Sequence, residues 1–242
     1  MAREQPEQQA PPVQRLRVRY AKRGRLRFTS HRDFSRAFER AVFRARVPMA
    51  YSSGFNPHPR ISYAGAAPTG SASEAEYLEL ALAEVVDPAD VHAALAEALP
   101  DGLDVVEVVE SAGGSLSDLL EGSRWRLDVP GTADEVRAEV EAFLAVESVT
   151  VQRMTKKGLR DLDARAPVLS LAFVDDAPPT VTLELVIRHL VPAVRPDDVL
   201  VAMAAVSGRE PRGVSLLTRL EQGPLDLRDT ENTQVRDPLH LG

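Results

Sequence analysis

The chain has 242 residues and a formal net charge of −7, with 44% hydrophobic and 27% charged residues. This length suits one large domain or two small ones, and the composition is that of a globular protein. The absence of cysteine excludes disulfides, cysteine-bound zinc, iron–sulfur clusters and thiol nucleophiles. No run approaches the ~18 apolar residues of a membrane span, so we expect a cytoplasmic protein without membrane contact.

Charge is distributed unevenly along the chain. Residues 15–60 contain 13 Lys and Arg against two acidic residues, a local net charge of +11, whereas the remainder contains 16 basic and 34 acidic residues. Such asymmetry indicates an anionic partner for the basic end. The alternative is that the basic end docks on the acidic remainder of the same chain or on an acidic protein.

The chain opens on a polar, Pro-rich segment at residues 1–13, predicted to be a disordered leader. A strand is predicted at residues 14–21, where apolar and basic residues alternate: Leu16, Val18 and Tyr20 with Arg15, Arg17 and Arg19. A period of two places the apolar side chains on one sheet face and the arginines on the other. A basic turn follows at residues 22–25, after which the alternation resumes at residues 25–28.

A helix is predicted to begin at Ser30, because Ser30 and Asp33 resemble a capping box with Asp in place of the usual Glu. Apolar residues then follow helical spacing and indicate one buried stripe, made of Phe34, Ala37, Phe38, Ala41, Val42 and Ala45. Arginine recurs every four residues on the other side, at Arg32, Arg36, Arg40 and Arg44. A loop rich in Gly, Asn and Pro follows at residues 52–59.

The order of these and later patterns predicts an α+β fold of two tandem ferredoxin-like (β-α-β-β-α-β) units with antiparallel sheets. The first unit spans residues 14–110, a linker residues 111–122, the second unit residues 123–222, and a flexible tail residues 223–242. Later strands of the first unit are predicted at 60–64, 77–84 and 103–109, and its second helix at 88–99. In the second unit, strands are predicted at 125–129, 149–154, 167–174, 180–187 and 214–220, and helices at 132–145 and 196–206.

Four short pieces of the first unit form a spaced motif: residues 19–22 (RYAK), 28–33 (FTSHRD), 54–62 (GFNPHPRIS) and 73–77 (SEAEY). This motif resembles the radical-SAM-linked protein family, a domain of unknown function. The resemblance implies one of two partners. In some bacteria the domain is fused behind a B12-binding radical SAM enzyme, and in others it stands alone, sometimes encoded beside a ribonuclease of the E/G type. Without cysteine the chain cannot hold a radical SAM cluster, so it would serve such an enzyme as a separate partner.

The tandem layout is also similar to that of the Cas6-like RNA-processing endoribonucleases. Those proteins use basic surfaces, a histidine near the first helix and a Gly-rich loop before the last strand. Here residues 207–213 (SGREPRG) occupy that loop position with two glycines. The likeness is one of fold, and function has to be argued from the site.

The basic residues of the first sixty positions are the candidate RNA contacts: Arg15, Arg17, Arg19, Lys22, Arg23, Arg25, Arg27, Ser30, Arg32, Arg36 and Arg60. Arginines two residues apart on a strand lie about 7 Å from each other, and each offers a planar donor fork that suits phosphate. A sheet face is a known RNA platform, but the aromatic pair that stacks bases there is missing. We therefore expect contacts to the RNA backbone, with the helix start at Ser30 either binding an anion or serving as a plain N-cap.

His31 and His58 are the histidines of the basic segment and the candidate catalytic residues. Each could act as general acid or base in metal-independent RNA cleavage, with Tyr63 or Lys22 completing the site. They could equally fix loop geometry or bond to phosphate without chemistry. A metal site of His31, Asp33 and His58 lacks compact ligand spacing, so we expect no metal and no cofactor.

Three functions follow from these patterns. The favoured one is a non-catalytic RNA-binding protein, the second is an endoribonuclease that uses His31 or His58, and the third is a protein adaptor for a radical SAM enzyme or an E/G-type ribonuclease. All three depend on arginines that face solvent without being neutralised by the chain's own carboxylates.

Overall fold

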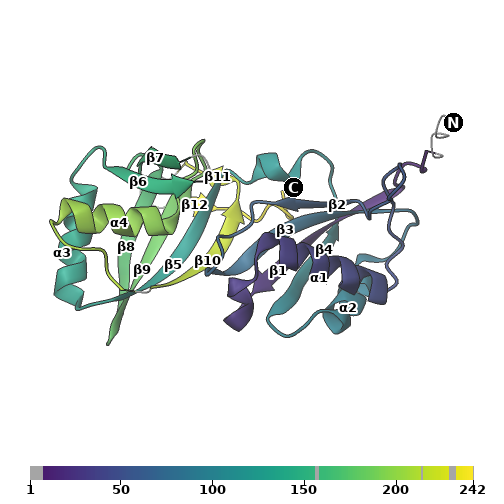
Figure 1. Ribbon diagram of the computed structural model, residues 1–242, viewed down its shortest axis with the longest axis horizontal. Coiled ribbons are helices and arrows are strands. Elements are labelled where there is room, and N and C mark those ends of the chain that lie inside the picture. Colours follow the sequence, from purple (N-terminus) through teal and green to yellow (C-terminus); the bar gives the residue numbers. More distant parts are fainter. Residues whose placement is uncertain (1–7, 156–157, 214, 229–232, 242) are drawn as a thin grey trace. The chain divides into compact units, whose positions relative to one another are not determined.

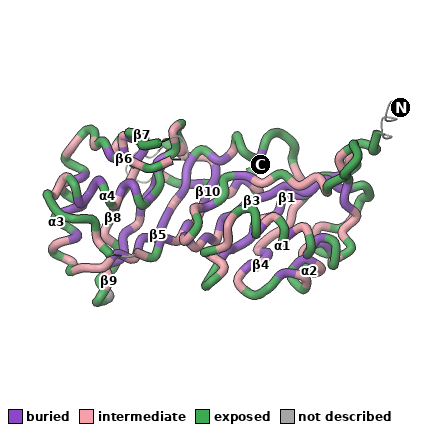
Figure 2. The backbone as a smooth tube through the Cα atoms, in the orientation of Figure 1, coloured by how far each residue is buried: buried purple, intermediate pink, exposed green. Residues whose placement is uncertain are grey.

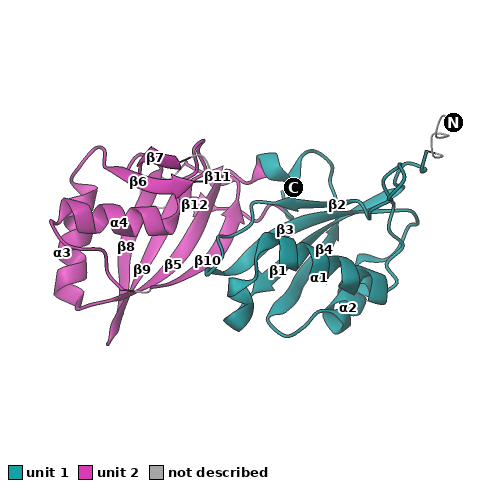
Figure 3. Cartoon of the chain, in the orientation of Figure 1, with its two compact units in different colours: residues 1–118, 239–242 teal, residues 119–238 magenta. Residues whose placement is uncertain are grey.

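The computed structural model describes residues 8–155, 158–213, 215–228 and 233–241, and within them the chain is an α+β protein with antiparallel sheets (Figure 1). The chain divides into two compact units, residues 1–118 with 239–242 and residues 119–238 (Figure 3). The predicted leader lies mostly outside the described residues, which begin at position 8. In the described residues, no helix has both the length and the apolar character needed to cross a membrane.

The described residues of the first unit up to Glu110 form four strands, two α-helices and one 3-10 helix. In chain order they are β1 (Gln14–Lys22), η1 (Gly24–Phe28), α1 (His31–Arg44), β2 (Ile61–Ala64), β3 (Ala72–Leu82), α2 (Pro88–Ala98) and β4 (Leu103–Glu110). The strands lie in the order β4-β1-β3-β2, and each neighbouring pair is antiparallel. Strands and helices thus follow one another in the predicted order along the chain. In the sheet, β3 lies between β1 and β2.

The core of the first unit lies between this sheet and the two helices. The apolar residues of β1 (Leu16, Val18 and Tyr20) pack with those of α1 (Phe34, Phe38, Ala41 and Val42), as both predicted patterns require. The ring of Tyr20 stacks on that of Phe34 with centroids 4.5 Å apart. The N-cap is also as predicted, since the Ser30 hydroxyl accepts the backbone N–H of Asp33 at 3.2 Å. The hydrophobic stripe therefore fixes which face of α1 remains outside.

The alternation of apolar and basic residues at 25–28 lies in a 3-10 helix and not in a strand. Gly24 has a φ of +54°, a left-handed conformation that glycine adopts without steric cost. The chain then turns into η1, with the Leu26 N–H bonded to the Arg23 carbonyl at 3.1 Å. Arg25 and Arg27 consequently belong to a helical turn.

The second unit repeats the same order of strands and helices, with an added hairpin. Its elements are β5 (Gly122–Pro130), α3 (Ala133–Leu144), β6 (Thr150–Thr155), β7 (Gly158–Asp163), β8 (Val168–Ala177), β9 (Thr180–Arg188), α4 (Pro196–Val206) and β10 (Leu216–Gly223). The main sheet has the order β10-β5-β9-β8, while β6 and β7 pair only with each other. The strand predicted at 149–154 therefore exists as β6, but it lies outside the main sheet.

The predicted linker and tail carry more structure than expected. Residues 111–122 include a 3-10 helix, η2 (Leu116–Leu119), and the first residue of β5. In the tail, β11 (Leu225–Asp226) pairs with β12 (Gln234–Val235). Short backbone pairings of this kind have too few residues to leave a periodic signal in the sequence.

Candidate nucleic-acid interface

The arginines of β1 are paired with a carboxylate or at least half-buried, although Arg15 at the start of the strand remains exposed. Glu79 of β3 lies directly across from Arg17, and its carboxylate contacts Arg15 at 2.9 Å and Arg17 at 3.4 Å. The guanidinium of Arg17 also donates to the carbonyl oxygen of Gly113 at 2.5 Å, and Ser111 donates its hydroxyl to Glu79 at 2.9 Å. Arg17 is 3% exposed as a result. The expectation of an open arginine platform on β1 is wrong, because a carboxylate of the neighbouring strand and the segment after β4 close this face.

The other basic residues of β1 and its turn are occupied in similar ways. Strand β1 is buried along most of its length (Figure 2). Arg19 on this strand is half-buried and lies across from Tyr77, and Lys22 is buried. Arg23 is exposed but bonds to the carboxylates of Glu74 and Asp104, the latter at 2.8 Å. The hydrogen bond that the Arg23 guanidinium donates to Glu74 raises the pKa of Arg23 further above its usual range. The predicted RNA contacts on β1, together with Arg23, thus already interact with other residues of the chain.

The outward face of α1 is different. Arg32, Arg36 and Arg40 are exposed, and no carboxylate of the described residues lies within 4.0 Å of any of these three guanidinium groups. Arg44 at the end of the helix is exposed and donates to the carbonyl oxygen of Ala98 in α2. The four-residue spacing keeps these side chains on the side away from the buried stripe. This row of positive charges is free to meet an anion.

Two further arginines precede the helix. Arg25 is exposed, and the Arg27 guanidinium lies over the ring of Phe28, 4.5 Å from its centroid. Arg60, half-buried before β2, binds through its backbone N–H to Ala50 at 2.9 Å. In the described residues none of the three forms an ion pair. They extend the set of cations that no carboxylate neutralises.

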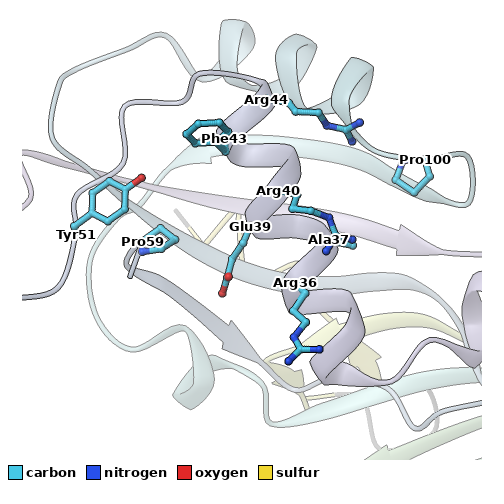
Figure 4. A pocket seen from close by; sticks show the side chains of 9 residues that line it. All are labelled: Arg36, Ala37, Glu39, Arg40, Phe43, Arg44, Tyr51, Pro59 and Pro100. Atoms are coloured by element: carbon cyan, nitrogen blue, oxygen red, sulfur yellow. The ribbon is translucent and has the colours of Figure 1, made fainter. Parts of the chain in front are cut away.

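A groove lies against the outward face of α1 (Figure 4). It is a hollow of about 730 Å³, lined by Arg36, Ala37, Glu39, Arg40, Phe43, Arg44, Tyr51, Pro59 and Pro100, which we call the α1 groove. Phe43 and Tyr51 are 79% and 39% exposed. Neither Phe43 nor Tyr51 is among the candidate site residues predicted from the sequence. A signal for Phe43 was present, because position 43 falls outside the helical stripe that predicts the core.

The geometry does not assemble the histidine site. His31 is exposed, and its ring meets that of Tyr63 edge-on with centroids 5.2 Å apart. Burial raises the pKa of Tyr63 to about 12, so its phenol stays protonated at neutral pH and is a poor base. His58 is exposed in the loop, where its backbone N–H donates to the Ser52 hydroxyl at 3.1 Å. In the described part of the chain, neither histidine ring hydrogen-bonds to another side chain, and Lys22 is buried in the sheet.

The helix start favours the plain N-cap over an anion site. The Ser30 hydroxyl donates to the Asp33 carboxylate at 2.7 Å while it accepts the Asp33 N–H. A negative side chain thus already occupies the first turn, where it complements the positive end of the helix.

These features define an α+β protein whose first unit carries a basic groove lined by aromatic side chains. The chain belongs to a bacterial family: the model described as "Uncharacterized protein conserved in bacteria (DUF2344)" matches residues 15–196. No curated protein matches the chain. The matched residues include α1 and the whole α1 groove.

Several solved structures are similar to the chain, and two of them are described here. One is the crystal structure of a Cbf5-Nop10-Gar1 complex, with 9% sequence identity and a TM-score of 0.47 over 90% of this chain and 55% of that one. The other is an unknown protein from Galdieria sulphuraria, with 12% identity and a TM-score of 0.24 over 85% of this chain and 98% of that one. The chain therefore spans about half the length of the first of these. Both TM-scores are below 0.5, so neither likeness bears on function.

Proposed function

We propose that the protein binds RNA without cleaving it, and that it contacts backbone phosphates through α1 and the turn before it. The observation that carries the proposal is the row of Arg32, Arg36 and Arg40, exposed on one helix face and not paired with any carboxylate of the described residues. Helical rise separates neighbours in this row by about 6 Å along the axis, a spacing that lets one strand of phosphates meet them in succession. Arg25, Arg27, Arg44 and Arg60 would extend the track.

The fold supports this proposal by holding the row rigidly. We propose that both units are ferredoxin-like, since each has the β-α-β-β-α-β order and a four-stranded antiparallel sheet. In the first unit the inner face of α1 packs through Phe34 and Phe38 onto the sheet, so the arginines project from a fixed helix. A cation on such an element loses less freedom on binding than one in a loop.

The test is the salt dependence of RNA binding. Phosphate contacts release counterions, so the affinity for a fluorescein-labelled RNA should fall steeply between 50 and 200 mM salt, by roughly 10³-fold or more for six contacts. Replacing Arg32, Arg36 and Arg40 by Ala should reduce the slope of log K against log salt by about three. Fluorescence anisotropy measures both.

A matched control removes the same charge elsewhere. Arg137, Arg160 and Arg195 are exposed arginines of the second unit that form no ion pair with the described residues, and their replacement by Ala should leave the slope nearly unchanged. Equal losses from the two triple variants would mean that only net charge matters, and a flat salt response would refute the proposal.

The same protein preparation also tests the two alternative functions. RNA cleavage in EDTA that His31→Ala and His58→Ala abolish would establish the endoribonuclease, and a protein captured after nuclease treatment would favour the adaptor.

A further inference from the structure

Aromatic side chains are exposed beside the arginine row. Phe43 lies in the last turn of α1 and Tyr51 in the loop that follows, and both line the α1 groove together with Pro59. Single exposed apolar residues are common, but here two exposed aromatic residues and the half-buried Pro59 line one hollow. Flat apolar side chains beside positive charges suit a ligand that has both flat and anionic groups.

A second hollow adjoins the first. It has a volume of about 570 Å³ and shares Glu39, Phe43, Tyr51 and Pro59 with the α1 groove. The aromatic residues therefore border two spaces at once. Arg36, Arg40 and Arg44 line the first space, and Arg46 lines the second. Flat groups can lie against the shared wall while anionic groups reach arginines on both sides.

Arg46 occupies a strained backbone position. It follows α1 with a φ of +52°, and is the one described residue other than glycine with a positive φ. The bonds from the Arg46 N–H to Phe43 and from the Val47 N–H to Val42, each at 3.2 Å, form the Schellman motif in which glycine is usual. An arginine there carries a steric cost that glycine would avoid.

We propose that the α1 groove and its neighbouring hollow bind single-stranded RNA, with bases stacked on Phe43 and Tyr51 and phosphates held by Arg36, Arg40 and Arg46. This inference rests on the proposed RNA binding and names its substrate class. Unpaired bases expose a face that an aromatic ring can stack on, whereas those of a duplex are already stacked on their neighbours. A duplex would therefore meet the arginine row but leave the aromatic wall unused.

The experiment compares two forms of one RNA on the full chain. A labelled, unstructured 12-nucleotide RNA is titrated alone and annealed to its complement, with anisotropy as the readout. We expect the single strand to bind more tightly, and the double substitution Phe43→Ala and Tyr51→Ala to weaken it on the order of 10-fold or more while leaving the duplex unchanged. The matched control is Leu159→Ala, since Leu159 of β7 is 63% exposed in the second unit.

The substitution Arg46→Gly separates the role of the side chain from that of the fold. We expect the melting temperature to stay level or rise, because glycine fits the positive φ, and the single-strand affinity to fall several-fold. A lower melting temperature with unchanged RNA affinity would overturn the role of Arg46.

The two proposals fail differently. Equal affinity for the two RNA forms would refute the single-strand inference and leave RNA binding standing. No affinity for either form would refute both. Loss of binding in the Leu159→Ala control to the same extent as in the aromatic variant would also count against the groove.

Discussion

The strand β1 and the helix α1 are both rich in arginine, yet they use it in opposite ways. On β1, Arg15 and Arg17 point at the Glu79 carboxylate, and Arg17 is buried. On α1, Arg36 and Arg40 point outward beside a groove (Figure 4). The same residue type is therefore structural in one element and available for binding in the next. What differs is the neighbouring element, since a strand inside a sheet has a partner strand within reach of its side chains and an outer helix face does not.

The largest expected effect is on stability. Glu79→Ala leaves the Arg17 guanidinium buried beside two backbone carbonyls but without its carboxylate. Removing one partner of a buried pair strands the other charge, which costs about 3 kcal/mol or more. We expect a clear fall in the denaturation midpoint of the first unit, measured by circular dichroism in urea.

A matched variant removes a carboxylate from an exposed ion pair, so that its effect on stability can be compared with that of Glu79→Ala. Glu74 pairs with Arg23 near the surface, so Glu74→Ala should cost less than about 1 kcal/mol. If Glu74→Ala and Glu79→Ala destabilised the protein equally, the view that Arg17 is structural because it is buried would be wrong.

The next effect is on RNA affinity. Arg23→Gln and Arg40→Gln each remove one positive charge, but the Arg23 charge is already balanced by Glu74 and Asp104. We expect Arg40→Gln to weaken RNA binding about 5-fold and Arg23→Gln less than about 2-fold at 150 mM salt, where the screening length is about 8 Å. Anisotropy titrations compare the two directly, and the reverse order would place the interface on the β1 side.

The sequence predicted the backbone well where periodicity was strong. The β1 alternation and the α1 stripe each placed their apolar residues in the core, because burial on one face imposes the period. It did not reveal β7 at residues 158–163, which is mostly exposed and pairs only with β6. This strand buries no continuous face and so leaves no periodic pattern, whereas the alternation at residues 25–28 falls in a helical turn because the chain turns at Gly24.

The sequence predicted only part of the candidate RNA-binding site, because part of that site depends on contacts between distant segments. The arginine row of α1 follows from its four-residue spacing, which local sequence displays. The neutralisation of Arg17 by Glu79 does not, because these residues are 62 positions apart and meet only through strand pairing. The groove likewise joins α1 to Tyr51, Pro59 and Pro100. Which charges remain free is thus decided by tertiary contacts, and a count of arginines cannot reveal it.

The smallest expected effect is a gain in RNA affinity instead of a loss. Glu39 is the acidic residue that lines both the α1 groove and its neighbouring hollow, and in the described residues it forms no ion pair. Its carboxylate repels a phosphate held by Arg36 or Arg40, so Glu39→Gln should tighten RNA binding about 2- to 3-fold at low salt, and less at high salt because screening weakens the repulsion. The matched control is Glu147→Gln, an exposed position of the second unit that makes the same change in net charge. Equal gains from both would reduce the effect to net charge. A loss of affinity in Glu39→Gln would instead mean that the carboxylate accepts a hydrogen bond from a base amino group, a contact that only an unpaired or splayed base could make in this groove.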